Sequence, residues 1–107
     1  MTATIAVEAA AAQVLELLTD LGNTPDGVAA EPRAAGAHGC RWGAKTCPIY
    51  HYLVQRCPGI TIVHVDGIAV DIEIGGRYDE VCVTEPVSEF ITRFDNGTAY
   101  QDLAVSQ

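Results

Sequence analysis

The spacing of apolar residues changes along the chain from helical to alternating and back to helical. Residues 7–21 follow the helical pattern, with apolar side chains at steps of three and four: Val7, Ala11, Val14, Leu18 and Leu21. This spacing gathers them on one face of a helix, which we predict over residues 7–21. Gly22 and Asn23 follow the last of them and end the predicted helix.

Prolines mark the start of two further short helices. The run 24–26, Thr-Pro-Asp, combines a capping residue, a proline at the first helical position and an acid in the first turn. Because an interior Pro32 would remove a backbone donor, this helix should have one or two turns and end by Gly36. Pro48 begins the third helix, with Cys47 or Thr46 as its cap, and Cys57-Pro58-Gly59 ends it. Trp42, in the glycine-containing loop 36–46, is predicted to anchor that loop to the core.

A β-hairpin is predicted where Asp66-Gly67 separates the apolar runs 60–65 and 68–74. This dipeptide suits a two-residue type I′ turn, which would determine the register of the two strands. Three pairs would then face the core: Val65 with Ile68, Val63 with Val70, and Thr61 with Ile72. On the other face Ile62 would oppose Asp71 and Ile60 would oppose Glu73, so that the two isoleucines are either covered by another element or exposed as a contact surface.

Gly75-Gly76 predicts a second turn, into a strand over residues 77–83, and helical spacing returns over residues 84–95. The whole chain, residues 1–107, is therefore predicted to form one α+β domain: three short N-terminal helices, a three-stranded antiparallel meander and a C-terminal helix. Three helices followed by a hairpin is also the order of elements in a winged helix. The residues beyond Thr98 are expected to be semi-ordered.

Length and composition fit this interpretation and suggest a location. A chain of 107 residues that is 49% hydrophobic can form a single core. It has no apolar run near the roughly 20 residues that cross a bilayer, and no basic segment precedes an apolar one at its start. Four cysteines without the spacing of a secreted disulfide scaffold favour reduced thiols. We therefore expect a soluble, cytoplasmic protein.

The net charge of −8 lies mainly in the second half, where residues 58–107 carry nine of the 14 acids and two of the six basic residues. Such a charge repels nucleic acid and anionic membranes, and it favours a basic partner or simply solubility. In a winged helix, residues 48–56 would contact DNA with a single arginine and the wing would present Asp66 to phosphates. We expect no nucleic acid and no membrane among the partners.

The residues between 38 and 57 suggest two kinds of chemistry. Cys47 and His51 are four residues apart on a predicted helix, and His38 and Cys40 in the preceding loop could complete a tetrahedral zinc site. Zinc is the only cofactor that the sequence suggests, and ordinary packing of buried cysteines is the simpler interpretation. Alternatively, Cys47 at a helix N-terminus, with Arg41 and Lys45 nearby in sequence, could be a reactive thiolate.

A protein-interaction surface requires no unusual geometry. Ile60 and Ile62 beside Asp71 and Glu73 would form an apolar strip with an acidic rim, suited to a homodimer or a basic partner, and Trp42 is a further candidate binding residue. We therefore predict a small non-enzymatic protein-binding or accessory domain. A zinc-binding module is the alternative, and a thiol enzyme that uses Cys47 is the third hypothesis.

The run from Thr24 through Leu53 contains a capped short helix, a glycine-containing loop and the sequence Cys-Pro-Ile-Tyr-His-Tyr-Leu. In this it resembles small uncharacterised proteins of actinobacteria and their phages. The alanine- and valine-rich composition is similar to that of proteins from GC-rich actinobacterial genomes. The resemblance implies a source and no particular function.

Overall fold

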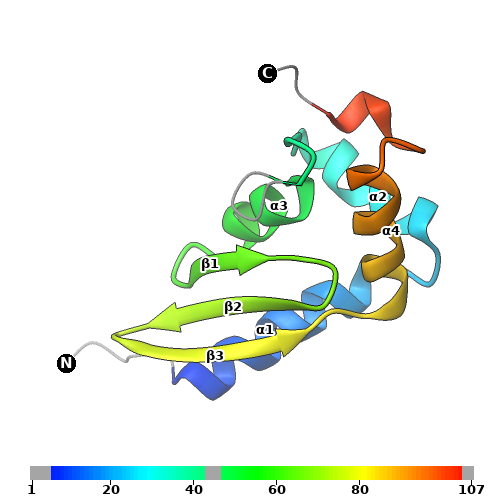
Figure 1. The fold of residues 1–107 in the computed structure, drawn as a ribbon. Helices are drawn as coiled ribbons and strands as arrows, with labels where there is room; N and C mark the ends of the chain where they lie inside the picture. The colour runs from blue at the N-terminus through cyan, green and yellow to red at the C-terminus, as the bar shows by residue number, and fades with distance from the viewer. Residues whose placement is uncertain (1–5, 43–46, 105–107) are drawn as a thin grey trace.

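The computed structural model describes residues 6–42 and 47–104, which form four α-helices, a three-stranded antiparallel sheet and a short 3-10 helix (Figure 1). The α+β class and the predicted order of helices and strands are confirmed. In chain order the elements are α1 (Val7–Asp20), α2 (Pro25–Ala35), α3 (Pro48–Arg56), β1 (Thr61–Val65), β2 (Ala69–Ile74), β3 (Arg77–Cys82), α4 (Glu85–Asp95) and η1 (Gln101–Leu103).

The second helix is longer than predicted. Thr24 caps it as expected, since its side-chain oxygen accepts a hydrogen bond from Gly27 N at 3.0 Å, and Gly36 ends it with φ +70°. Pro32 nevertheless lies inside the helix. Its ring is fully buried, so apolar contacts offset the backbone hydrogen bond that proline cannot make.

The sheet has the order β1-β2-β3, but the predicted hairpin register is wrong. Val65 pairs with Val70 rather than with Ile68, and the register shifts between Ile62 and His64. The cause is local: Asp66 Oδ1 accepts hydrogen bonds from Ile68 N at 2.7 Å and from Ala69 N at 2.8 Å. This carboxylate stabilises a three-residue loop over residues 66–68 in place of the two-residue turn.

The changed register places the isoleucines in the core. Ile62 pairs with Ile72, and Ile60 and Ile62 are only 7% and 4% exposed. The predicted exposed strip of Ile60 and Ile62 is therefore wrong, and the alternative in which another element covers them is correct. Asp71 pairs with His64 on β1 and with Glu80 on β3, while Glu73 pairs with Thr61 and Tyr78.

One hydrophobic core joins the helices to one face of the sheet. The first helix packs along β3 and β2, α3 packs against β1, and α2 packs against both α4 and α3 (Figure 1). The largest fully buried side chains include Phe90 and Phe94 of α4, Leu18 of α1 and Leu53 of α3. Burying each such side chain contributes about 1.5–3 kcal/mol relative to exposure. No helix within the described ranges is long and apolar enough to span a membrane.

The chain after α4 is docked more firmly than the sequence predicts. Leu103 is fully buried, and Tyr100 donates a hydrogen bond from its hydroxyl to Asp26 Oδ1 at 2.8 Å. Arg33 of α2 binds both carboxylate oxygens of Asp102, at 2.6 and 3.2 Å. These contacts hold residues 100–103 against α2.

Candidate functional site

The four predicted zinc ligands do not come together. His38 Nδ1 lies 3.1 Å from the carbonyl oxygen of Gly36, Cys40 is half-buried, and His51 lies edge-on to Tyr50. Nowhere in residues 6–42 and 47–104 do three or more His, Cys, Asp or Glu side chains gather as a metal site would require. The predicted zinc site of His38, Cys40, Cys47 and His51 is therefore wrong. The thiol of Cys47 instead accepts a hydrogen bond from Tyr50 N, at 3.3 Å, within its own helix.

Cys47 caps α3 as predicted, but its thiol is not activated. The residue is 3% exposed, and burial raises the pKa of the Cys47 thiol to about 11, although hydrogen bonds from Tyr50 N and Ile49 N act in the opposite direction. The cost of desolvating a thiolate exceeds the benefit of the helix N-terminus. The predicted low-pKa thiolate, and with it the basis for a thiol enzyme, is wrong. Lys45 and Thr46, which entered these predictions, lie outside the described residues.

Cys47 lies at a pocket of about 320 Å³ that the sequence did not predict. Its lining comes from four segments: Trp42; the α3 cap Cys47; residues 64–67 at the end of β1 and in the loop after it; and Ile91, Thr92 and Asp95 of α4. The hydroxyl of Ser88 donates to Gly67 O at 2.6 Å and so ties that loop to α4. The pocket combines apolar walls with two carboxylates and an imidazole.

Trp42 stands at this pocket with 74% of its surface exposed. Its backbone is nevertheless constrained, because Trp42 N donates to Asp95 Oδ1 at 2.7 Å. Arg41 adds a second attachment: Nε donates to Phe94 O at 3.0 Å, and the guanidinium lies 5.7 Å from the centre of the Phe94 ring. The prediction that the Trp42 side chain anchors the loop to the core is therefore wrong; the anchors are the Trp42 backbone and Arg41.

The backbone of Trp42 has φ +62°, in the left-handed region that a bulky side chain seldom adopts. Such a conformation costs about 1–3 kcal/mol and persists only where surrounding contacts enforce it. Here the contacts of residues 41 and 42 with the end of α4 enforce it. They hold a large aromatic side chain in solvent beside a pocket.

His64 and Asp66 form a hydrogen bond at the pocket, with Nε2 and Oδ2 3.1 Å apart and each side chain nearly half exposed. Burial raises the pKa of the Asp66 carboxyl, but hydrogen bonds from Ala69 N, Ile68 N and His64 outweigh it. The net pKa of Asp66 lies below its usual value, so this carboxylate is charged at neutral pH.

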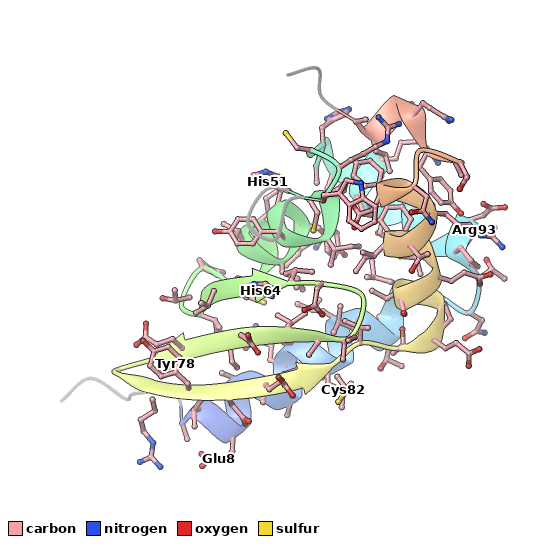
Figure 2. All side chains as sticks on the ribbon, in the orientation of Figure 1. Glu8, His51, His64, Tyr78, Cys82 and Arg93 are labelled. Carbon is pink, nitrogen blue, oxygen red and sulfur yellow. The ribbon has the colours of Figure 1, made fainter. Side chains whose placement is uncertain are left out.

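The other predicted binding residues lie outside this pocket. Asp71 and Glu73 belong to the central strand, and Glu73 Oε2 accepts a hydrogen bond from Gly76 N at 2.6 Å, which closes the β2–β3 turn. Tyr78 on β3 is 71% exposed and lies near that turn, at the end of the sheet opposite the loop 66–68 (Figure 2). Neither Asp71 nor Glu73 lines the pocket, although Asp71 pairs across the sheet with His64, which does.

Of the pocket residues, the sequence indicated only Trp42, as a candidate binding residue, and Cys47, as a zinc ligand or reactive thiol, as functional; Val65, Asp66 and Gly67 were assigned to the hairpin alone. The only local signal was the pair His64 and Asp66, two residues apart where β1 ends and the following loop begins. Ile91, Thr92 and Asp95 gave no signal, since they read as ordinary positions of an amphipathic helix.

Comparison of the chain with protein-family models, with curated proteins and with solved structures gives no match. The resemblance to small actinobacterial and phage proteins stays a prediction.

Proposed function

We propose that this chain is a small non-enzymatic protein-binding domain and that the pocket beside Trp42 is its binding site. One observation carries the proposal: the chain's only tryptophan is 74% exposed, yet its backbone is held by Asp95 at the edge of a 320 Å³ pocket. Tryptophan is among the residues that contribute most binding energy at protein interfaces. A backbone that is already ordered loses little entropy when a partner binds.

The partner is a peptide segment of another protein rather than a second copy of this chain. Each copy carries a net charge of −8, and Asp66 and Asp95 both line the pocket. Two copies that met at this pocket would bring like charges together, which opposes association. We also propose that the protein acts in the cytoplasm, a location supported by its four cysteines, all of which are free thiols.

The test compares two exposed aromatic residues. Peptides of 12 random residues displayed on phage are selected on the wild-type protein, and the affinity of each selected peptide is measured by fluorescence anisotropy. For Trp42→Ala we expect an affinity loss of at least about 30-fold, which corresponds to a hot-spot cost of roughly 2 kcal/mol. Tyr78→Ala is the matched control, because Tyr78 is 71% exposed and lies outside the pocket. It should change affinity by less than about twofold.

Two results would contradict the proposal. If Tyr78→Ala weakened binding while Trp42→Ala did not, the binding site would lie on the sheet. If sedimentation equilibrium showed a dimer that Trp42→Ala dissociated, the occupant would be a second copy. Circular dichroism of both variants checks that neither result comes from unfolding.

A further inference from the structure

We propose that the side chain inserted into the Trp42 pocket is a lysine or arginine of the bound segment. This inference rests on the proposed function and specifies the chemistry of the partner. Lysine and arginine combine an apolar stem of three or four methylene groups with a charged end. The pocket offers a complementary surface to each part.

The apolar stem would lie against Trp42, Val65 and Ile91, which supply the nonpolar part of the lining. The exposed indole ring adds a further attraction, because a cation within about 6 Å of the face of a tryptophan ring is attracted by the ring's quadrupole. Among the aromatic side chains tryptophan gives the strongest such interaction. An exposed tryptophan beside a carboxylate therefore favours a cationic side chain over a purely apolar one.

The charged end would meet two carboxylates. Asp95 Oδ1 accepts a hydrogen bond from Trp42 N, and Asp66 accepts hydrogen bonds from Ile68 N, Ala69 N and His64. A carboxylate offers about four acceptor positions, so both groups retain capacity for an ammonium or guanidinium donor. Hydrogen bonds between ionised groups are about twice as strong as neutral ones.

The arginines nearest to the pocket in sequence are held elsewhere. Arg41 contacts the carbonyl oxygen and the ring of Phe94, and Arg93 pairs with Glu89 at 2.7 Å. Lys45 lies outside the described residues. The variant Lys45→Gln therefore tests whether Lys45 of this chain competes with the partner's lysine or arginine for the pocket. A leucine of the partner would fit the apolar walls, but it would remove water from Asp66 and Asp95 without replacing the lost hydrogen bonds.

The experiment follows the indole N–H resonance of Trp42 in ¹⁵N-labelled protein. Because the chain has one tryptophan, the spectrum contains a single indole peak. Four acetylated and amidated tripeptides are titrated: Gly-Lys-Gly, Gly-Arg-Gly, Gly-Leu-Gly, and Gly-Lys-Gly acetylated on the lysine side chain. Acetylation keeps the stem and removes the charge. We expect the Lys and Arg peptides to shift the indole peak saturably, and the acetylated peptide to bind about tenfold more weakly or worse.

Variants then assign the charge effect to the two carboxylates. Asp66→Asn and Asp95→Asn keep an oxygen that can accept the same backbone hydrogen bonds, and each should weaken the Lys peptide by about three- to tenfold. Glu16→Gln is the matched control, since it removes one negative charge from an exposed position on α1 that does not line the pocket. It should leave the affinity unchanged. Lys45→Gln should bind the Lys peptide at least as tightly as the wild type.

The outcomes separate this inference from the function on which it rests. If the Leu or acetylated peptide binds as tightly as the Lys peptide, or if Asp66→Asn and Asp95→Asn have no effect, the inference is overturned and the Trp42 site stands. If none of the tripeptides shifts the indole peak in either the wild type or Lys45→Gln, this inference is overturned too. The proposed function would still stand if phage-selected peptides bind the wild type and lose affinity in Trp42→Ala. If phage display yields no such peptides, the inference and the proposed function are both overturned.

Discussion

Replacing Asp66 by alanine should destabilise the hairpin, because it removes the acceptor of two backbone donors in the β1–β2 loop. Asp66 Oδ1 lies 2.7 Å from Ile68 N and 2.8 Å from Ala69 N. A hydrogen bond to a charged group contributes about 1.5–3 kcal/mol, and the partial exposure of this carboxylate reduces that value, so we expect a total loss of about 1–3 kcal/mol. Since 1 kcal/mol lowers Tm by roughly 4–8 °C in a domain of this size, the loss corresponds to about 4–24 °C.

Asp66→Asn separates the hydrogen bonds from the charge. The asparagine side chain keeps an oxygen that can accept from the two backbone donors, so Asp66→Asn should lose less than half as much stability as Asp66→Ala at pH 7. Thermal unfolding followed by circular dichroism gives both values. Hydrogen exchange at the amides of Ile68 and Ala69 shows whether the loop opens locally.

The pH dependence tests the charge itself. The folded-state pKa of Asp66 is lowered, so its contribution to stability is present above the unfolded value of about 3.9 and is lost as pH falls through the folded value. Asp102, whose pKa is lowered by Arg33, also stabilises the fold less as pH falls, and it does so equally in the wild type and in Asp66→Asn. The stability difference between wild type and Asp66→Asn should therefore shrink below about pH 4. A difference that is constant from pH 7 to pH 3, or an Asp66→Ala variant as stable as the wild type, would refute the reasoning.

Two further predictions concern the buried cysteine and the C-terminal segment. With iodoacetamide at pH 7, exposed Cys82 should be alkylated first and Cys47 last, because Cys47 is buried and burial raises its pKa to about 11. If peptide mass spectra showed faster labelling of Cys47, the hypothesis that Cys47 is an activated thiolate would be supported again. Leu103→Ala should lower the free energy of unfolding, measured by urea titration, by about 2–5 kcal/mol, because Leu103 is fully buried. The control is Gln101→Ala at an exposed position, which should change this free energy by less than about 0.5 kcal/mol. Identical curves for Leu103→Ala and the wild type would mean that residues 100–103 do not belong to the cooperative unit.

The boundaries of helices and strands could be read from the sequence where short-range chemistry determines them. Thr24-Pro25 and Cys47-Pro48 start helices because a capping side chain and a proline suit those backbone positions whatever surrounds them. The alternation around residues 61–74 likewise predicts two antiparallel strands. The register failed because the carboxylate of Asp66 competes with the turn that the dipeptide Asp-Gly usually forms.

The candidate site could not be predicted, because it depends on which segments meet. The sequence by itself determined the α+β class, the order of the elements and the acidity of the chain, since these follow from local periodicity and composition. Only the tertiary structure decided that Trp42 is exposed, that Cys47 is a buried thiol with a raised pKa, and that Asp66 and Asp95, 29 positions apart, line one pocket. Burial and the approach of distant carboxylates depend on packing between segments far apart in the chain, and no local pattern encodes them.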